Sequence, residues 1–260
     1  MKDSPLQIVL LHGITGSRRF FAKLEDQLRL TPPPAATYSI DLLGFGDNKN
    51  VESDFTAGDQ LKWIEDSICT RFPSGKIALI GHSIGGVLSL AWAASHVSRV
   101  SKIVLLNAPL GESREDIVVS LTRDHIGWAP ILLKYKPFAH LACVVLRGTH
   151  VYRALHFAKP SYIPDEVLQD YTKHTWKSLA RTFDGVLLGL PGMPLLRQIV
   201  EVPILNLTGS DDGEISRRTI DQPNVGSVEL SGGHLMLLEH PAETMEAIVR
   251  FLARDVPTRV

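Results

Sequence analysis

Cysteine is scarce in this sequence, because the 260 residues include only Cys69 and Cys143. The two cysteines lie far apart and match no metal-binding or redox spacing, so the sequence gives no indication of a cysteine metal site or a redox motif. Cys69 falls on the apolar face of a predicted helix, where a buried, unreactive thiol is expected. We therefore assign neither cysteine a function.

An excess of charge of either sign is also lacking. The chain has 27 lysines and arginines against 28 acidic residues, which gives a formal net charge of −1. Nucleic acids and anionic membranes are bound through clustered positive charge, so neither is an expected partner.

Long hydrophobic runs are missing as well. In the N-terminal sequence MKDSPLQIVLLHG a single lysine is followed at once by an acid, and the apolar run is too short for a signal-peptide core or a membrane span. These features predict a cytoplasmic protein with no membrane span. The sequence leaves the oligomeric state open.

The chain does contain a regular alternation of apolar runs and helical patterns. The apolar runs predict strands at 7–13, 36–44, 76–83, 100–109, 202–212 and 226–233. Helical spacing of apolar residues appears over 56–72 and from 241 onward. The alternation predicts an α/β fold with a mostly parallel, roughly six-stranded central sheet and helices on both faces. The active site of such a sheet lies beyond the carboxyl ends of its strands.

The alternation stops between residue 110 and about residue 190, where several helical patterns but no convincing strand are found. We interpret residues 111–190 as an inserted α-helical cap on a core formed by 1–110 and 191–260. Residues 164–183 begin with a proline and two acids and end with cations, which predicts a single amphipathic helix.

The sequence KIALIGHSIGG, residues 76–86, points most clearly to chemistry. A strand-like run passes directly into helix formers, with Ser83 at the turn between Gly81 and Gly85. Small residues are needed at those two positions because a β-carbon there would collide with the adjoining strand or helix. The pattern G-x-S-x-G is typical of a nucleophile elbow. Taken alone it is equally compatible with a glycine-rich packing turn, so support must come from elsewhere in the chain.

A serine hydroxyl is a poor nucleophile and needs a base within hydrogen-bond reach. Of the ten histidines, His234 lies just after the last predicted strand, behind a flexible glycine pair that would let its imidazole reach across the strand ends. We predict that His234 is the base. His12 and His82 flank the site within turns, where structural or orienting roles are expected.

The base in turn needs an acid that orients it. The loop after the strand at 202–212 offers Asp211, Asp212 and Glu214. One strand earlier, the corresponding position carries Asn107, which cannot supply a carboxylate. The acid is therefore expected in the later loop.

Attack on a carbonyl also requires two backbone N–H groups that stabilise the oxyanion. We predict that these are the N–H groups of Ile84, immediately after the nucleophile, and of Ile14, in the turn that ends the first strand. The five histidines between 111 and 190 lack the close paired spacing of a metal site, so neither a metal nor another cofactor is expected.

Five motifs in this order resemble those of the α/β-hydrolase superfamily. They are HGITGS (12–17), DLLGFGDN (41–48), GHSIGG (81–86), PLLRQIVEVPILNLTGSDD (194–212) and GGHLMLLEHPAE (232–243). The resemblance implies that Asp212 is the acid of a Ser83, Asp212 and His234 triad. The HG motif comes so early that the two leading strands usual in the family do not fit, which predicts six strands.

The resemblance also implies acyl chemistry on a small-molecule substrate, because serine replaces the aspartate of related epoxide hydrolases and dehalogenases. Carboxylic esters are the main expected substrates; lactones, thioesters and carbon-carbon bonds cleaved by the same triad are alternatives. The aromatic and aliphatic residues of 126–157 are expected to pack the cap onto the core; the alternative is that some of them line an acyl pocket over Ser83. A ligand receptor or binding scaffold on the same fold is the alternative of another class.

Overall fold

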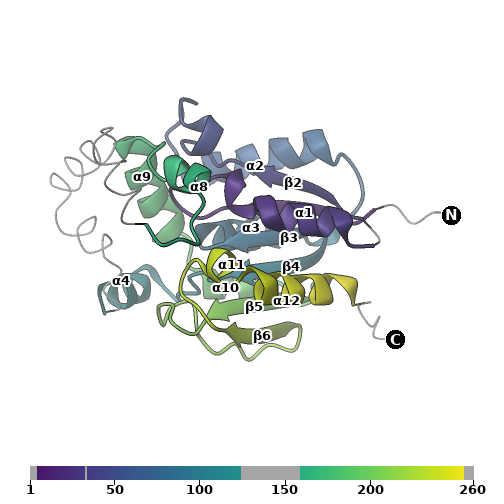
Figure 1. The fold of residues 1–260 in the computed structure, drawn as a ribbon. Coiled ribbons are helices and arrows are strands. Elements are labelled where there is room, and N and C mark those ends of the chain that lie inside the picture. Colours follow the sequence, from purple (N-terminus) through teal and green to yellow (C-terminus); the bar gives the residue numbers. More distant parts are fainter. Residues whose placement is uncertain (1–4, 33, 124–158, 255–260) are drawn as a thin grey trace.

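The computed structural model describes residues 5–32, 34–123 and 159–254 (Figure 1). At its centre is one parallel sheet with the strand order β2-β1-β3-β4-β5-β6. The strands are β1 (Gln7–Leu11), β2 (Ala36–Ile40), β3 (Ile77–His82), β4 (Val100–Leu106), β5 (Ile204–Gly209) and β6 (Val225–Leu230). All six predicted strands are confirmed, and the sheet is entirely rather than mostly parallel. Each strand ends earlier than predicted, because the predicted ranges include the first residues of the loops that follow.

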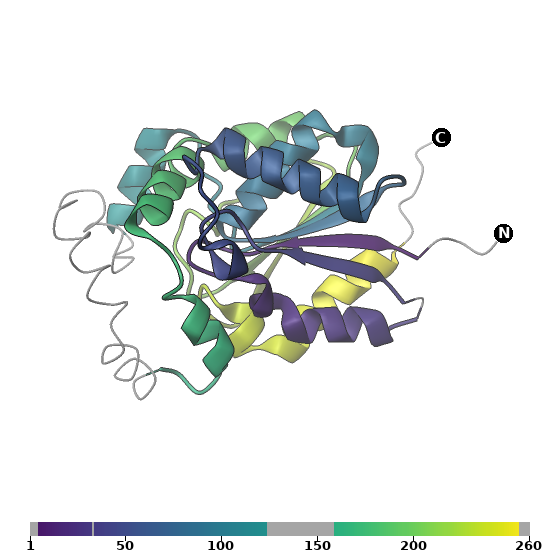
Figure 2. The ribbon, with the colours of Figure 1, turned by 90° about the horizontal axis from the view of Figure 1, so that it is seen from above.

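Helices cover both faces of the sheet (Figure 2). One face carries α2 (Ala57–Arg71), α3 (Ile84–Ser95) and α10 (Gly192–Gln198), and the other carries α1 (Ala22–Leu30) and α12 (Pro241–Ala253). The shorter elements are η1 (Arg18–Phe21), η2 (Gly46–Asn48), η3 (Val97–Arg99) and α11 (Met236–Glu239). Alternate residues of β1 enter separate cores: Val9 packs in the cluster that contains α2 and α3, and Ile8 packs in the cluster that contains α1 and α12. Two covered faces explain why the strands read as continuous apolar runs.

The order of the strands indicates where a ligand-binding crevice is expected. The chain passes from β1 to β2 at one edge and then crosses to β3 on the other side of β1, so the strand order reverses between β1 and β3. Ligands of open parallel sheets bind outside the carboxyl ends of the strands at such a switch point. Leu11 pairs with Gly81 there, which brings the HG turn beside the turn that holds Ser83.

Between β4 and β5 the described residues form helices and no strand. These elements are α4 (Arg114–Arg123), α8 (Asp165–Asp170), α9 (Trp176–Thr182), the π-helical turn η4 (Phe183–Leu187) and α10. In Figure 1, α4, α8 and α9 lie at the carboxyl ends of the strands. Whether 111–190 forms a separate cap with these boundaries stays a prediction, and residues 126–157 lie outside the described part.

The prediction of one helix over 164–183 is wrong, because the chain turns between α8 and α9. Thr175 caps α9 in a reciprocal box with Ser178, so a new helix begins there. The buried carboxylate of Asp170, at the end of α8, accepts hydrogen bonds from Ser17 and Arg19 of the core, the latter at 2.7 Å. The backbone of Thr175 is extended, with φ −95° and ψ 159°, which interrupts a helix at this residue.

The prediction for Cys69 is also wrong, since its side chain is exposed. Helix α2 turns Ile64 and Ile68 toward the sheet, and Cys69 lies about 100° further around the helix. Its thiol donates to Glu65 at 3.1 Å. Cys143 lies outside the described residues. In the described parts of the chain, no helix is long and apolar enough to cross a membrane.

Candidate active site

Ser83 occupies a sharp turn between β3 and α3, as the sequence predicts. Its backbone has φ 54° and ψ −124°, a conformation that costs about 1–3 kcal/mol in a non-glycine residue. A β-carbon on Gly81 would lie 2.4 Å from the carbonyl oxygen of Gly85, and one on Gly85 would lie 2.1 Å from that of Leu11. The strand, the helix and the neighbouring strand approach so closely that only glycine fits at both positions.

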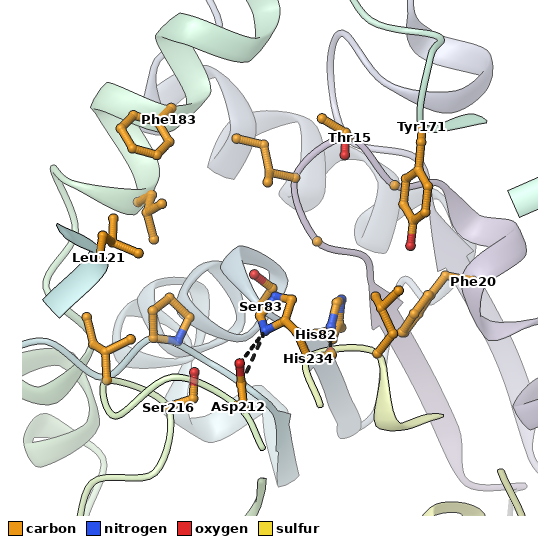
Figure 3. Close-up of a pocket in the computed structure, with 17 residues that line it drawn as sticks. Thr15, Phe20, His82, Ser83, Leu121, Tyr171, Phe183, Asp212, Ser216 and His234 are labelled. Carbon is orange, nitrogen blue, oxygen red and sulfur yellow. Dashed lines mark hydrogen bonds and ion pairs between the residues drawn. The ribbon is translucent and has the colours of Figure 1, made fainter. Parts of the chain in front are cut away.

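The loops after β5 and β6 bring Asp212 and His234 together. His234 Nδ1 lies 3.0 Å from Oδ1 and 3.2 Å from Oδ2 of Asp212 (Figure 3). Burial raises the pKa of the Asp212 carboxyl, but the hydrogen bond and charge of His234 and further donors from the loop outweigh that effect. The pKa of Asp212 is therefore lowered, and the carboxylate is charged beside the imidazole.

The other two acids of this loop lie elsewhere. Asp211 is exposed and accepts a hydrogen bond from its neighbour Ser210. Glu214 is paired with Arg123 of α4. Of the three carboxylates that the sequence leaves open, the structure brings Asp212 to His234.

Ser83 and His234 line the same pocket at the carboxyl ends of the strands (Figure 3). The Ser83 side chain makes no hydrogen bond to any residue that the structure describes, whereas the His234 imidazole is held by Asp212. Serine and base are often loosely spaced in a free enzyme and tighten when substrate binds. The pocket thus brings Ser83, His234 and Asp212 together at the carboxyl ends of the strands.

Two buried side chains hold the main chain of His234, and sequence reasoning identified only one of them. His82 Nε2 donates to the His234 carbonyl oxygen at 2.8 Å. Asn107 Nδ2 donates to the carbonyl oxygens of Gly233 and His234, both at 3.0 Å, while its Oδ1 accepts from the Gly209 N–H at 2.8 Å. We call these contacts the His234 clamp. An orienting role for His82 was expected; Asn107 was considered only as a missing acid.

The backbone conformation of Asn107 and the neutral state of His82 explain how the His234 clamp forms. Asn107 directly follows β4 with φ 49°, a conformation that asparagine tolerates better than most residues. Burial lowers the pKa of His82 to about 3, helped by the nearby charge of His234, so this ring is neutral and donates from Nε2. The ring also stacks on Phe20, with centroids 4.4 Å apart.

The turn after β1 is fixed by His12. Its Nδ1 donates to the Gly13 carbonyl oxygen at 2.7 Å, and its Nε2 accepts from the Leu42 N–H at 3.0 Å. Burial lowers the pKa of His12, which agrees with this neutral form. Ile14 lines the pocket, and Ile84 is the buried first residue of α3. Their roles as oxyanion donors stay predictions.

The pocket has a volume of about 410 Å³ and mostly apolar walls. The apolar side chains that line it are Phe20, Pro109, Leu121, Phe183, Leu187, Ile215 and Leu235. Besides the residues already named, Thr15, Tyr171 and Ser216 supply hydroxyls. Within the described residues no lysine or arginine lines this pocket, and no three metal-ligating side chains gather in one place.

Comparison with known proteins agrees with this architecture. Residues 7–133 match the sequence model of the alpha/beta hydrolase fold. The chain is 22% identical over 258 residues to the 2-hydroxy-6-oxo-6-(2'-aminophenyl)hexa-2,4-dienoic acid hydrolase of Metapseudomonas resinovorans, which covers 95% of this chain and 84% of that protein. MenH from S. aureus superposes with a TM-score of 0.71 at 19% identity, over 96% of this chain and 95% of that chain. The protein belongs to the α/β-hydrolase superfamily.

Other relatives are longer proteins. Probable lysophospholipases BODYGUARD 4 and BODYGUARD 3 of Arabidopsis thaliana are 24% and 26% identical, and the chain spans 46% and 28% of their length. A carboxylesterase structure from Nitrososphaera gargenis superposes with a TM-score of 0.70 at 21% identity, over 96% of this chain and 90% of that chain. The similar proteins thus include enzymes with different substrates on one fold.

Proposed function

We propose that the protein is a serine hydrolase that cleaves a carboxylic ester, or a related acyl bond, through an acyl-enzyme on Ser83. The observation that carries the proposal is the position of Ser83 at a strained turn, in one pocket with a His234 imidazole held by the Asp212 carboxylate. A serine in such a turn presents its hydroxyl above the sheet, which is the geometry that nucleophilic attack requires.

In the proposed reaction Ser83 Oγ attacks the carbonyl carbon while His234 Nε2 takes the hydroxyl proton. The C=O electrons move onto the oxygen, where the N–H groups of Ile14 and Ile84 would stabilise the negative charge. The intermediate then expels the alcohol, which receives the proton from His234, and leaves an ester on Ser83. A water molecule, deprotonated by His234, attacks this ester in the same way and releases the acid and free Ser83.

Asp212 and the clamp have separate tasks in this scheme. The Asp212 carboxylate holds the imidazole in the tautomer whose Nε2 is free, and it stabilises the imidazolium that forms in each step. The neutral His82 ring lies 5.0 Å from the His234 ring and therefore does not repel that imidazolium. The scheme uses no metal or cofactor.

The pocket supports an uncharged acyl substrate. Its apolar walls favour hydrocarbon, and each buried methylene contributes about 0.8 kcal/mol. A carboxylate-bearing substrate would call for a cation, and none lines the pocket within the described residues. We also propose that 111–190 acts as a cap, since Leu121, Tyr171 and Phe183 of this segment close the pocket over the strand ends. Lactones and thioesters fit the same description.

Labelling with a fluorophosphonate and hydrolysis of p-nitrophenyl esters test the proposal together. Ser83 should be labelled, and the label should be lost in Ser83→Ala. The kcat/KM should rise from the acetate to about the hexanoate ester, because each further methylene is buried against the apolar walls. An unlabelled Ser83 would favour a receptor or scaffold, and near-normal hydrolysis by Ser83→Ala or His234→Ala would refute the mechanism.

A further inference from the structure

The scheme above gives no function to the hydroxyl of Tyr171. Tyr171, at the C-terminal end of α8, lines the pocket that contains Ser83. Its Oη is buried and has no hydrogen-bond partner among the residues that the structure describes. Buried tyrosine hydroxyls usually find a partner, because a hydroxyl removed from water and left unpaired lowers stability. Phenylalanine would fill the same space without that loss.

The position of Tyr171 is well defined by its surroundings. Its backbone N–H donates to the Val167 carbonyl oxygen at 3.2 Å, and the preceding residue, Asp170, is tied to the core by Ser17 and Arg19. The side chain packs against the cluster that contains Phe20. These contacts fix the backbone of Tyr171 and place its side chain against the core.

The two sides of the pocket differ in chemistry. Figure 3 shows Leu121 and Phe183 on one side of Ser83, and Tyr171, Phe20 and Thr15 on the other. The first side presents the hydrocarbon side chains of Leu121 and Phe183. On the second side, Tyr171 and Thr15 add hydroxyls beside the aromatic ring of Phe20.

We infer that the Tyr171 hydroxyl donates a hydrogen bond to an acceptor oxygen of the substrate, an ether, hydroxyl or carbonyl oxygen outside the bond that is cleaved. This inference rests on the proposed function and narrows it, since the preferred substrate then carries a second oxygen function. A pocket that pairs a buried donor with a substrate oxygen discriminates against the analogue that lacks it, because that analogue leaves the donor unpaired. Because the hydroxyl is shielded in the free protein, the ring must turn slightly as substrate enters.

Ether analogues of simple esters test the inference. On the acyl side, p-nitrophenyl hexanoate is compared with esters in which one methylene at a time is replaced by oxygen. On the alcohol side, butyl acetate is compared with 2-methoxyethyl acetate. For each ester the kcat/KM of Tyr171→Phe is divided by that of the wild type, so the intrinsic reactivity of the ester cancels.

For at least one ether ester this quotient should be about three- to tenfold lower than for the parent alkyl ester. This is the range expected for the loss of one neutral hydrogen bond. The thermal midpoint of Tyr171→Phe should equal or exceed that of the wild type, because the variant removes an unpaired buried hydroxyl. Equal quotients for every ether and alkyl pair would overturn the inference. A lowered midpoint with equal quotients would show a structural role instead.

Tyr38→Phe is the matched control. Tyr38 lies on β2, outside the pocket, with its ring packed edge-on against Phe72. Its quotients should be the same for ether and alkyl esters. Fluorophosphonate labelling of the wild type separates the two proposals: if Ser83 is labelled but the quotients are equal, only the Tyr171 inference fails. If Ser83 is not labelled, the proposed function fails and the inference fails with it.

Discussion

The imidazole of His82 donates from Nε2 to the main-chain carbonyl oxygen of His234, 152 residues later in the sequence, at 2.8 Å. The residue before the proposed nucleophile thus holds the backbone of the proposed base. Asn107 donates to the same oxygen from the end of β4. The neighbouring strands β3 and β4 therefore determine together where the His234 side chain begins.

Removing the clamp at Asn107 should lower kcat more than it raises KM. Asn107→Ala leaves the carbonyl oxygens of Gly233 and His234 with fewer donors, so the loop relaxes and the imidazole loses its alignment with Ser83. We expect kcat to fall by roughly ten- to a hundredfold with KM nearly unchanged, the pattern of an interaction that acts in the transition state. Steady-state kinetics on one p-nitrophenyl ester measures this.

Asn206→Ala is the control for that experiment. Asn206 is also a buried asparagine, on the adjacent strand β5, and makes no contact with the clamp. Its variant should lose stability without the selective fall in kcat. Equal kinetic losses in both variants would mean that Asn107 only supports the fold.

Asp212→Asn should reduce kcat/KM by about three to four orders of magnitude, because an amide neither fixes the required tautomer nor stabilises the imidazolium. Asp211→Asn removes a charge of the same sign from the neighbouring position, whose side chain is exposed, and should change the rate by less than about threefold. Kinetics of the two variants on the same ester decides the assignment. If Asp211→Asn caused the large loss of kcat/KM instead, Asp211 rather than Asp212 would be the acid.

The free energy of unfolding should decrease as the pH is lowered below 6.5, and His82 should contribute to that decrease. Burial lowers the pKa of His82 from 6.5 to about 3, so the unfolded chain takes up a proton in this range and the folded chain does not. The unfolded state binds more protons, so the free energy of unfolding decreases by about 1.4 kcal/mol per pH unit from this residue as pH falls from 6.5 toward 3.

Urea unfolding at several pH values between 7 and 4 measures this slope. His82→Gln keeps a side-chain donor but does not titrate, so its slope should be smaller by about 1.4 kcal/mol per pH unit than that of the wild type. Identical slopes would mean that His82 is charged in the folded protein, in conflict with its buried contact to His234.

Gly85→Ala should be strongly destabilising, whereas Gly226→Ala should be tolerated. The new β-carbon at 85 would lie 2.1 Å from the Leu11 carbonyl oxygen, so β1 and α3 must move apart. At Gly226, on β6, no atom lies within 4 Å of the new β-carbon. We expect a loss of more than about 3 kcal/mol in the first case and less than about 0.5 kcal/mol in the second. Thermal unfolding of both variants measures these losses of stability. Similar losses in the two variants would contradict the turn geometry.

Much of the architecture follows from local pattern in the sequence. The inner strands β1, β3, β4 and β5 are recognised because each is a short apolar run that is buried on both faces. The edge strands β2 and β6 are less buried. The turn around Ser83 is recognised from its glycine spacing, because a β-carbon at Gly81 would collide with Gly85 only four residues later. Motif order, rather than geometry, selected Asp212 from three carboxylates, and the structure places that carboxylate against His234.

The failures share a different cause. A single helix over 164–183 has the correct periodicity, yet the chain turns between α8 and α9, next to Asp170, which is held by Ser17 and Arg19 more than 150 residues earlier. Cys69 satisfies the helical spacing on the apolar side, but which part of that side meets the sheet depends on how α2 is rotated. Neither constraint is visible in the residues nearby.

The sequence by itself therefore determined the parallel sheet, the turn at Ser83 and the candidates for base and acid, because these depend on side-chain period and steric limits along the chain. Only the tertiary structure decided that Asn107 and His82 hold the His234 carbonyl, and that the Tyr171 hydroxyl enters the pocket wall without a partner. Those contacts join segments that the sequence separates, and a hydrogen bond depends on distances of about 3 Å that no local pattern records.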